Sequence, residues 1–139
     1  MAKGHVLHVV AAGEVGGAER MLVDLIGARS STTEGRTHSV ALFTPSEKLR
    51  ALLHEERIEV DDRGSSVREG PWPFLKSTLG SRDVAWLAPV IAKRDARIVH
   101  LHTFASQVIG TRAAIAAGAR VVRTEHSTRV YDDPSCWPF

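Results

Sequence analysis

The stretch VLHVVAAGEVGGAERMLVDLI, residues 6–26, decides the fold of this chain. Its first six residues predict an apolar strand and its last nine an amphipathic helix, joined by a turn that holds Gly13, Gly16 and Gly17. Glycines let a backbone approach a ligand closely, and the N–H groups at a helix N-terminus favour an anion. The turn therefore predicts either a phosphate-facing corner or simply a tight connection. Residue 15 is valine, so the spacing is not the dinucleotide fingerprint G-x-G-x-x-G, which argues against a nicotinamide or flavin site.

The rest of the chain alternates strands and helices. Further strands are predicted over 37–43, 58–60, 97–102 and 120–125, and further helices over 44–56, from 81 onward and over 104–117. Thr44 is predicted to cap the second helix, with Pro45 in its first turn and Glu47 completing a capping box, and Ser81 to cap the third. The alternation predicts a single α/β domain over residues 1–139. We expect a Rossmann-like three-layer α/β/α fold with a parallel sheet of about five strands in the order 3-2-1-4-5.

Composition narrows the class of protein. Hydrophobic residues make up 43% of the 139 residues and charged residues 24%, which are globular values, and the net charge is only +2. The sequence has no basic stripe of the kind that would predict nucleic-acid binding. The single cysteine, Cys136, excludes an internal disulfide and is expected to be inert. No apolar run has membrane-spanning length, and the N-terminus does not resemble a signal peptide, so we expect a cytoplasmic protein.

The segment 61–80 is predicted to be irregular, because it is rich in Gly, Ser, Pro and charge. It contains the sequence GPWPFLK at residues 70–76. Trp72 and Phe74 are expected either to fill the edge of the core, which we favour, or to contact a ligand, a partner or a membrane surface.

Polar residues follow the predicted strands at the edge where such sheets bind ligands, the carboxyl ends at the switch in strand order. This edge is expected to gather the glycine turn, His102 with Thr103, and Glu125 with His126. His126 could bond a sugar hydroxyl or a phosphate, carry a proton, or bond only to neighbouring backbone.

The other histidines are given no catalytic role. His8 is expected to be a satisfied core residue, while His5, His38 and His54 are expected at the surface or at strand edges. His100 and His102 are two apart on one strand and so share a face, a spacing that can hold a metal. The sequence offers no obvious third ligand, so no metal site is predicted.

Three blocks together resemble family-four retaining glycosyltransferases of the GT-B fold. The first is HVLHVV at 5–10 followed by GGAER at 16–20. The second is IVHLH at 98–102, which is similar to the family's DIVHxH strand except that Arg97 replaces the aspartate. The third is VVRTEHS at 121–127, similar to VVxTEH. The blocks occur in the family's order and cover essentially the whole chain.

The resemblance implies the acceptor-side, N-terminal half of an enzyme with two Rossmann-like domains. It implies a nucleotide diphosphate sugar as donor and a sugar or lipid-linked acceptor, without a cofactor or a metal. Gly16 and Gly17 would face the donor diphosphate, and His126 would contact the donor sugar as the catalytic residue. Glu19, His102 and Thr103 would serve the acceptor or order the loop.

The resemblance also implies that the donor-binding C-terminal domain, or a partner subunit that supplies it, is missing from this chain. The chain alone is then expected to be inactive, and lipid-linked acceptors would bring it to the inner membrane face. Two alternatives stay open: half of a sugar-nucleotide epimerase, and a non-catalytic binding module whose apolar face would lie around Trp137 and Phe139.

Overall fold

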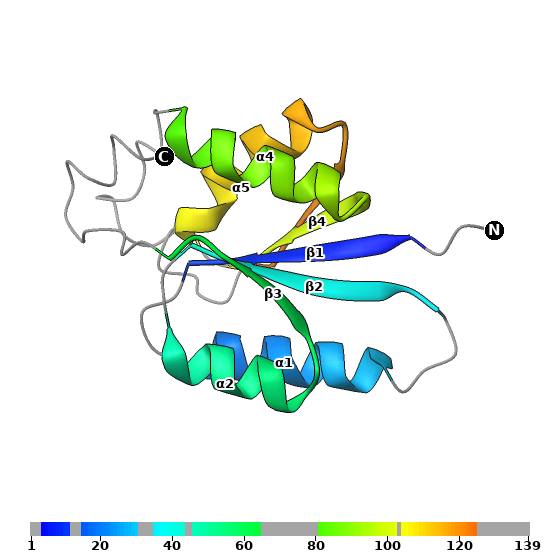
Figure 1. The fold of residues 1–139 in the computed structure, drawn as a ribbon, viewed down its shortest axis with the longest axis vertical. Coiled ribbons are helices and arrows are strands. Elements are labelled where there is room, and N and C mark those ends of the chain that lie inside the picture. Colours follow the sequence, from blue (N-terminus) through cyan, green and yellow to red (C-terminus); the bar gives the residue numbers. More distant parts are fainter. Residues whose placement is uncertain are drawn as a thin grey trace.

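The computed structural model describes residues 4–11, 15–30, 35–43, 46–64, 81–102 and 104–124. Its five strands form one parallel sheet in the order β3-β2-β1-β4-β5, as predicted from the sequence (Figure 1). The strands are β1 His5–Val10, β2 Thr37–Leu42, β3 Glu59–Asp62, β4 Ala96–Leu101 and β5 Arg120–Arg123. The helices are α1 Gly17–Ser30, α2 Glu47–Glu55, α4 Arg82–Lys93 and α5 Phe104–Ala116.

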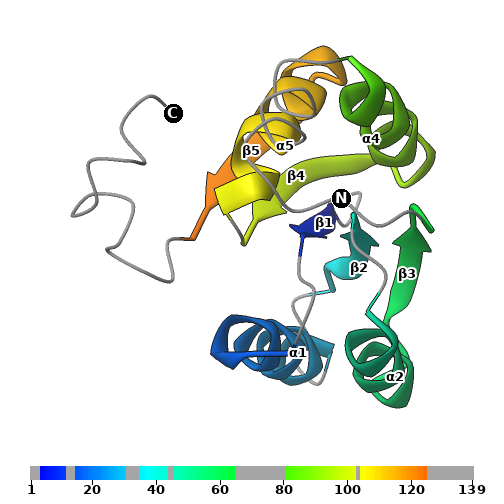
Figure 2. The same ribbon diagram turned by 90° about the vertical axis from the view of Figure 1, so that its left-hand side faces the viewer.

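The helices cover the two faces of the sheet in pairs. Figure 2 shows α1 and α2 on one face and α4 and α5 on the other, which gives the predicted three layers. This arrangement follows from right-handed crossovers between parallel strands, because the chain changes face when it passes from β3 to β4.

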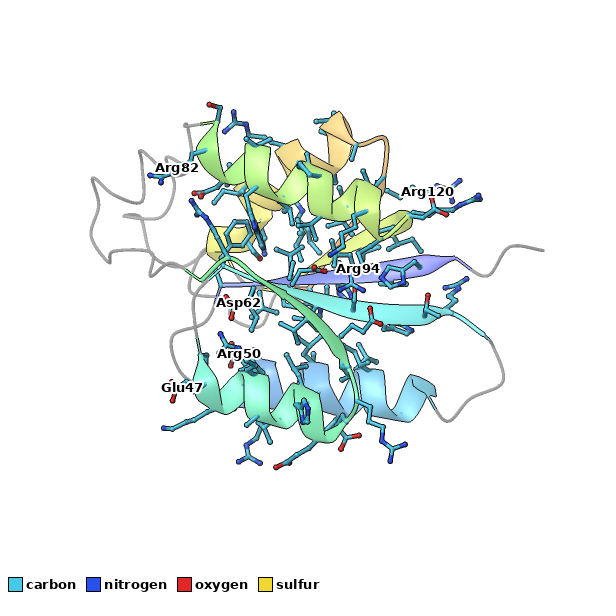
Figure 3. All side chains as sticks on the ribbon, in the orientation of Figure 1. Glu47, Arg50, Asp62, Arg82, Arg94 and Arg120 are labelled. Atoms are coloured by element: carbon cyan, nitrogen blue, oxygen red, sulfur yellow. The ribbon has the colours of Figure 1, made fainter. Side chains whose placement is uncertain are left out.

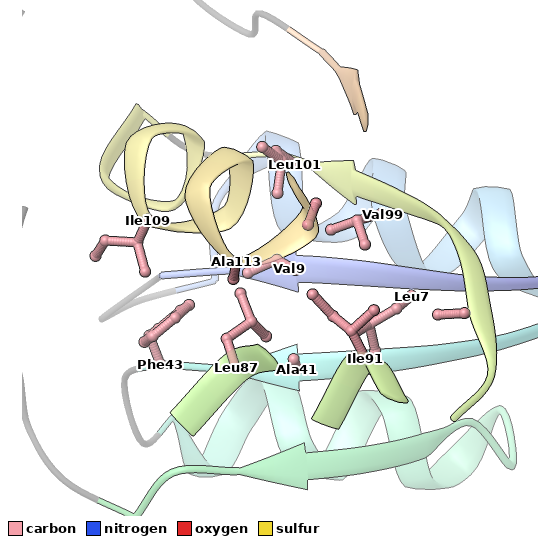
Figure 4. Packing of buried hydrophobic residues seen from close by; sticks show 12 residues of the cluster. Leu7, Val9, Ala41, Phe43, Leu87, Ile91, Val99, Leu101, Ile109 and Ala113 are labelled. Atoms are coloured by element: carbon pink, nitrogen blue, oxygen red, sulfur yellow. The ribbon is translucent and has the colours of Figure 1, made fainter. Parts of the chain in front are cut away.

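Central strand β1 is apolar on both sides because it is covered on both sides. Leu7 and Val9 pack with Leu87 and Ile91 of α4 and with Ile109 of α5 (Figure 4). On the opposite face a second cluster joins β1 and β2 to α1 and α2; it contains Val10, Val40, Leu42, Leu22, Ile26, Leu49 and Leu53. Alternation along β1 therefore turns His8 toward the face of α1 and α2.

The predicted helix caps differ from those observed. The N-cap of α2 is Ser46, whose Oγ accepts a hydrogen bond from the N–H of Leu49 at 3.3 Å. The prediction of Thr44 as the cap was wrong, because Ser46, two residues later, holds the cap position; Glu47 is then the first helical residue and completes no capping box. Ser81 does precede α4, but its side chain makes no capping hydrogen bond.

Strand β3 runs two residues further than predicted. Asp61 and Asp62, expected to begin the irregular segment, pair with Ala41 and Leu42 of β2. The N–H of Arg63 then donates to the carbonyl of Leu42 at 3.0 Å, which continues the ladder. The expected positions of Trp72 and Phe74 lie outside the described residues.

Ion pairs from both helix layers converge on β3, an edge strand of the described sheet. Arg50 of α2 pairs with Asp62, as Figure 3 shows. Arg94, just after α4, pairs with Glu59, and its Nε lies 2.6 Å from Asp61 Oδ2. These contacts bridge the strand to a helix on each side. Among the described residues, no helix has the length and apolar character needed to cross a membrane.

Candidate functional site

The glycine turn after β1 is ordered by the side chain of Glu19. The Glu19 carboxylate accepts a hydrogen bond from the N–H of Gly16 at 2.8 Å, and Glu19 itself is only 8% exposed. Gly16 is the residue before α1, and Glu19 is the third residue of that helix. A glutamate at this position reaching back to the cap N–H is one half of a capping box.

The first turn of α1 has backbone N–H groups without an acceptor inside the helix. The helix's own hydrogen bonds begin with Arg20 N, which donates to Gly16 O at 3.2 Å, so the amides of residues 17–19 have no partner within the helix. Gly17 is exposed, and a Cβ added there would meet no atom within 4 Å. Because Gly16 already donates to Glu19, the Gly17 amide is the more accessible of the two predicted phosphate-facing donors.

Four imidazoles gather on the α1 face of the sheet. His8 is 1% exposed, and its Nδ1 lies 2.9 Å from Nε2 of His102, which is 3% exposed. Its Nε2 lies 3.0 Å from Nδ1 of His38 on β2. On β4, the His100 ring lies 4.0 Å from that of His102 between centroids, and its Nε2 lies 2.7 Å from Thr124 Oγ1. We call His8, His38, His100 and His102 the histidine cluster.

Strand register explains why these residues meet. His8 and His100 are cross-strand partners in the parallel pair of β1 and β4. His102 directly follows β4, and its N–H donates to Val9 O at 3.2 Å, which extends the ladder beyond the strand. Residues 100 and 102 therefore share a face at the carboxyl end of β4, as predicted.

Burial keeps the centre of the histidine cluster neutral. The burial of His8 and then the neighbouring rings of His102, His100 and His38 lower its pKa to about 2. A neutral imidazole offers one N–H and one lone pair, so His8 donates one of its two cluster hydrogen bonds and accepts the other. The rings of the cluster can therefore form a chain in which each donates one hydrogen bond and accepts another, or they can offer nitrogen lone pairs to a ligand.

The sequence analysis located part of this arrangement. It placed His8 in the core and His102 at the edge of the sheet, and the structure agrees. It assigned His38 to the surface or a strand edge without a role; in the structure His38 is partly buried near the start of β2, and it hydrogen-bonds His8. The available signal was the strand order, which puts β2 and β4 on either side of β1. Thr103, Glu125 and His126 lie outside the described residues, as do Cys136, Trp137 and Phe139.

Comparison with known proteins gives a family. The chain matches the model of Glycosyltransferase Family 4 over residues 15–138. No curated protein sequence matches the chain.

Solved structures with the same fold include glycosyltransferases and a sugar-nucleotide enzyme. A glycosyltransferase from Rickettsia africae superposes with a TM-score of 0.66 at 20% identity, over 96% of this chain and 34% of that one. Anabaena HepE, solved with UDP and glucose, gives 0.66 at 18% identity over 93% of this chain and 31% of that one. A UDP-N-acetylglucosamine 2-epimerase from Listeria monocytogenes, described as putative, gives a TM-score of 0.69 at 23% identity, over 99% of this chain and 35% of that one. The chain thus spans about one third of the length of these structures.

Proposed function

The chain belongs to glycosyltransferase family 4, and from this premise we propose that it is the acceptor-side domain of a retaining glycosyltransferase. The enzyme would transfer a sugar from a nucleotide diphosphate sugar to a sugar or lipid-linked acceptor. The proposal is supported by strand order: the Gly16–Gly17 turn follows β1 and His102 follows β4, and these two strands are parallel neighbours at the point where the strand order reverses. Solved structures of this fold include one with UDP and glucose bound.

In this mechanism the protein mainly positions the reactants and stabilises the leaving diphosphate. The Gly17 amide, at the positive end of α1, would donate to a diphosphate oxygen. Glu19 would hold the turn in shape by accepting from Gly16 rather than by touching the acceptor. His102 and Thr103 would face the acceptor, and His126 would orient the donor sugar.

The donor nucleotide would be held mainly by a second domain, in the same polypeptide or in a partner subunit. We place the reaction in the cytoplasm. A lipid-linked acceptor would bring Trp72 and Phe74 to the inner face of the membrane.

Donor binding tests the role of the glycine turn. Calorimetry with UDP-glucose and related donors, in the presence of a family donor-binding domain, should give a Kd for the chain and for Gly17→Val. A valine side chain would occupy the space that the diphosphate needs, so we expect donor affinity to fall at least about tenfold. Gly4→Val is the matched control, because a Cβ there also meets no atom within 4 Å but lies before β1, at the opposite edge of the sheet. Equal affinities for both variants would contradict the proposed phosphate site.

Half of a sugar-nucleotide epimerase is the second candidate, favoured by the fold likeness to the Listeria protein. Product analysis separates the two. A glycosyltransferase releases a nucleoside diphosphate and a glycosylated acceptor, whereas an epimerase returns an isomeric sugar nucleotide without needing an acceptor.

A further inference from the structure

We propose that His8, His100 and His102 form a three-imidazole site for a divalent transition metal ion, with Zn²⁺ as the first candidate. Each residue offers one ring nitrogen, and the three nitrogens lie within 4.8 Å of one another. Imidazole is a preferred ligand of Zn²⁺, Ni²⁺, Cu²⁺ and Co²⁺. The inference goes beyond the proposed function, which requires no metal, and does not depend on it.

The third ligand comes from a different strand. His100 and His102 supply two imidazoles from β4, and register places His8 of β1 opposite His100. The ring centroid of His8 lies 5.2 Å from that of His100 and 5.2 Å from that of His102. One ion would therefore join the two strands that flank the reversal of strand order.

Hydrogen bonds outside the three ligands hold two of the rings in the way that metal-binding histidines require. Such histidines use one nitrogen for the metal and the other for a hydrogen bond that fixes ring orientation and tautomer. His8 has this partner in His38 Nδ1, at 3.0 Å from Nε2. His100 has one in Thr124 Oγ1, at 2.7 Å from Nε2.

Proton balance also permits binding. Nδ1 of His8 and Nε2 of His102 are 2.9 Å apart and share one proton in the metal-free protein. A metal ion would take both lone pairs, and the shared proton would move to the other nitrogen of its own ring, so that all three rings stay neutral. Zn–N bonds of about 2.0–2.1 Å in a tetrahedron separate ligand nitrogens by about 3.4 Å, which small ring rotations achieve. Three protein ligands leave a fourth position for water or a substrate oxygen.

Metal stoichiometry measured on the full chain tests the site directly. Chelator-treated protein is dialysed against Zn²⁺, and bound metal is measured by mass spectrometry; Co²⁺ is added in parallel because tetrahedral Co²⁺ absorbs visible light. We expect one ion per chain, tetrahedral Co²⁺ bands and a rise in Tm with Zn²⁺. His100→Asn should weaken binding at least about 100-fold, and His38→Asn about 10- to 100-fold through the lost hydrogen bond.

His54→Asn is the matched control, since His54 is an exposed histidine on α2 outside the histidine cluster. His100→Asn is the deciding variant because His100 is only partly buried, so the substitution should leave the fold intact by circular dichroism. The proposal is overturned if the wild-type chain binds less than one Zn²⁺ ion per chain and its Co²⁺ form shows no tetrahedral absorption bands. It is overturned equally if a folded His100→Asn variant binds Zn²⁺ as tightly as His54→Asn does.

Discussion

At the scale of single residues, His8 shows most clearly what folding does to a side chain. Its pKa falls from an ordinary value of 6.5 to about 2, because burial and four nearby imidazoles disfavour its cation. The unfolded chain therefore binds a proton below about pH 6.5 that the folded chain does not. The share of the unfolding free energy that comes from neutral His8 is fully present above that pH and is lost as the pH falls toward 2. We expect a loss of about 1.4 kcal/mol per pH unit from this residue, so about 2 kcal/mol between pH 6.5 and pH 5.

Urea unfolding of chelator-treated, metal-free protein at several pH values between about 7 and 5 measures this slope. His8→Leu is the informative variant, because leucine has a similar volume and does not titrate. The variant should lose the His8 share of the pH dependence, whatever its stability at neutral pH. An identical slope in both proteins would mean that His8 is protonated in the folded state.

Glu19 is the second residue whose role can be isolated. We expect Glu19→Ala to cost about 1 kcal/mol of unfolding free energy, because the Gly16 N–H loses its acceptor. Glu19→Gln keeps a side-chain oxygen at the same reach and should cost less. Asp24→Ala, at an exposed position later in α1, is the control for loss of an acidic side chain. If Glu19→Gln and Glu19→Ala unfold at the same urea concentration, the hydrogen bond contributes nothing.

At the scale of elements, α5 packs against β4 through a position that only glycine fits. A Cβ added to Gly110 would overlap the side chain of Leu101, which is fully buried. We expect Gly110→Ala to cost about 1–3 kcal/mol, the usual range for overpacking a core. Gly17→Ala, where a Cβ meets nothing within 4 Å, should cost nothing measurable. Denaturant unfolding of both variants tests this, and equal stabilities would show that the two elements can separate to admit a methyl group.

The connection between β3 and the end of α4 gives another prediction. Lys93 and Arg94 both pair with Asp61, but Lys93 is 70% exposed and Arg94 only 16%. We expect Arg94→Gln to cost about 1–3 kcal/mol, because the partly buried Asp61 carboxylate then keeps only the exposed Lys93 as its charged partner. Lys93→Gln should change stability by less than about 0.5 kcal/mol, as exposed pairs do. A similar cost for both variants in urea unfolding would contradict this ranking.

The bounds of helices and strands were predictable where the hydrophobic residues followed a single clear period, and less predictable elsewhere. The hydrophobic pattern of residues 6–26 predicted the starts of β1 and α1 to within one residue of those observed. The cap of α2 was missed because Thr44 and Ser46 are both residue types that favour the N-cap, so residue type alone does not distinguish them. The histidine cluster was missed as a unit because it needs residues from three strands. Sequence spacing shows only the pair on β4, while register adds His8 and His38.

At the scale of the whole molecule, strand order and layering followed from the alternation of elements and the handedness of their crossovers. The site is less determined by sequence, because its chemistry depends on which strand ends become neighbours. We expect the chain alone to show no measurable sugar transfer, since it spans about a third of the solved relatives. Adding a family donor-binding domain should restore turnover in an assay of released nucleoside diphosphate. Turnover by the chain alone would show that it holds a complete donor site.

The carboxylates of β3 have a further consequence for the protein in concentrated solution. An exposed strand edge invites a strand from another molecule, and natural sheets resist this with charge. Glu59, Asp61 and Asp62 put three acidic groups on four consecutive residues of this edge, and their cations belong to helices on either side. An incoming strand would have to displace those cations or bury unmatched carboxylates. The same ion pairs that attach β3 to its layers therefore oppose the pairing of a further strand with this edge of the described sheet.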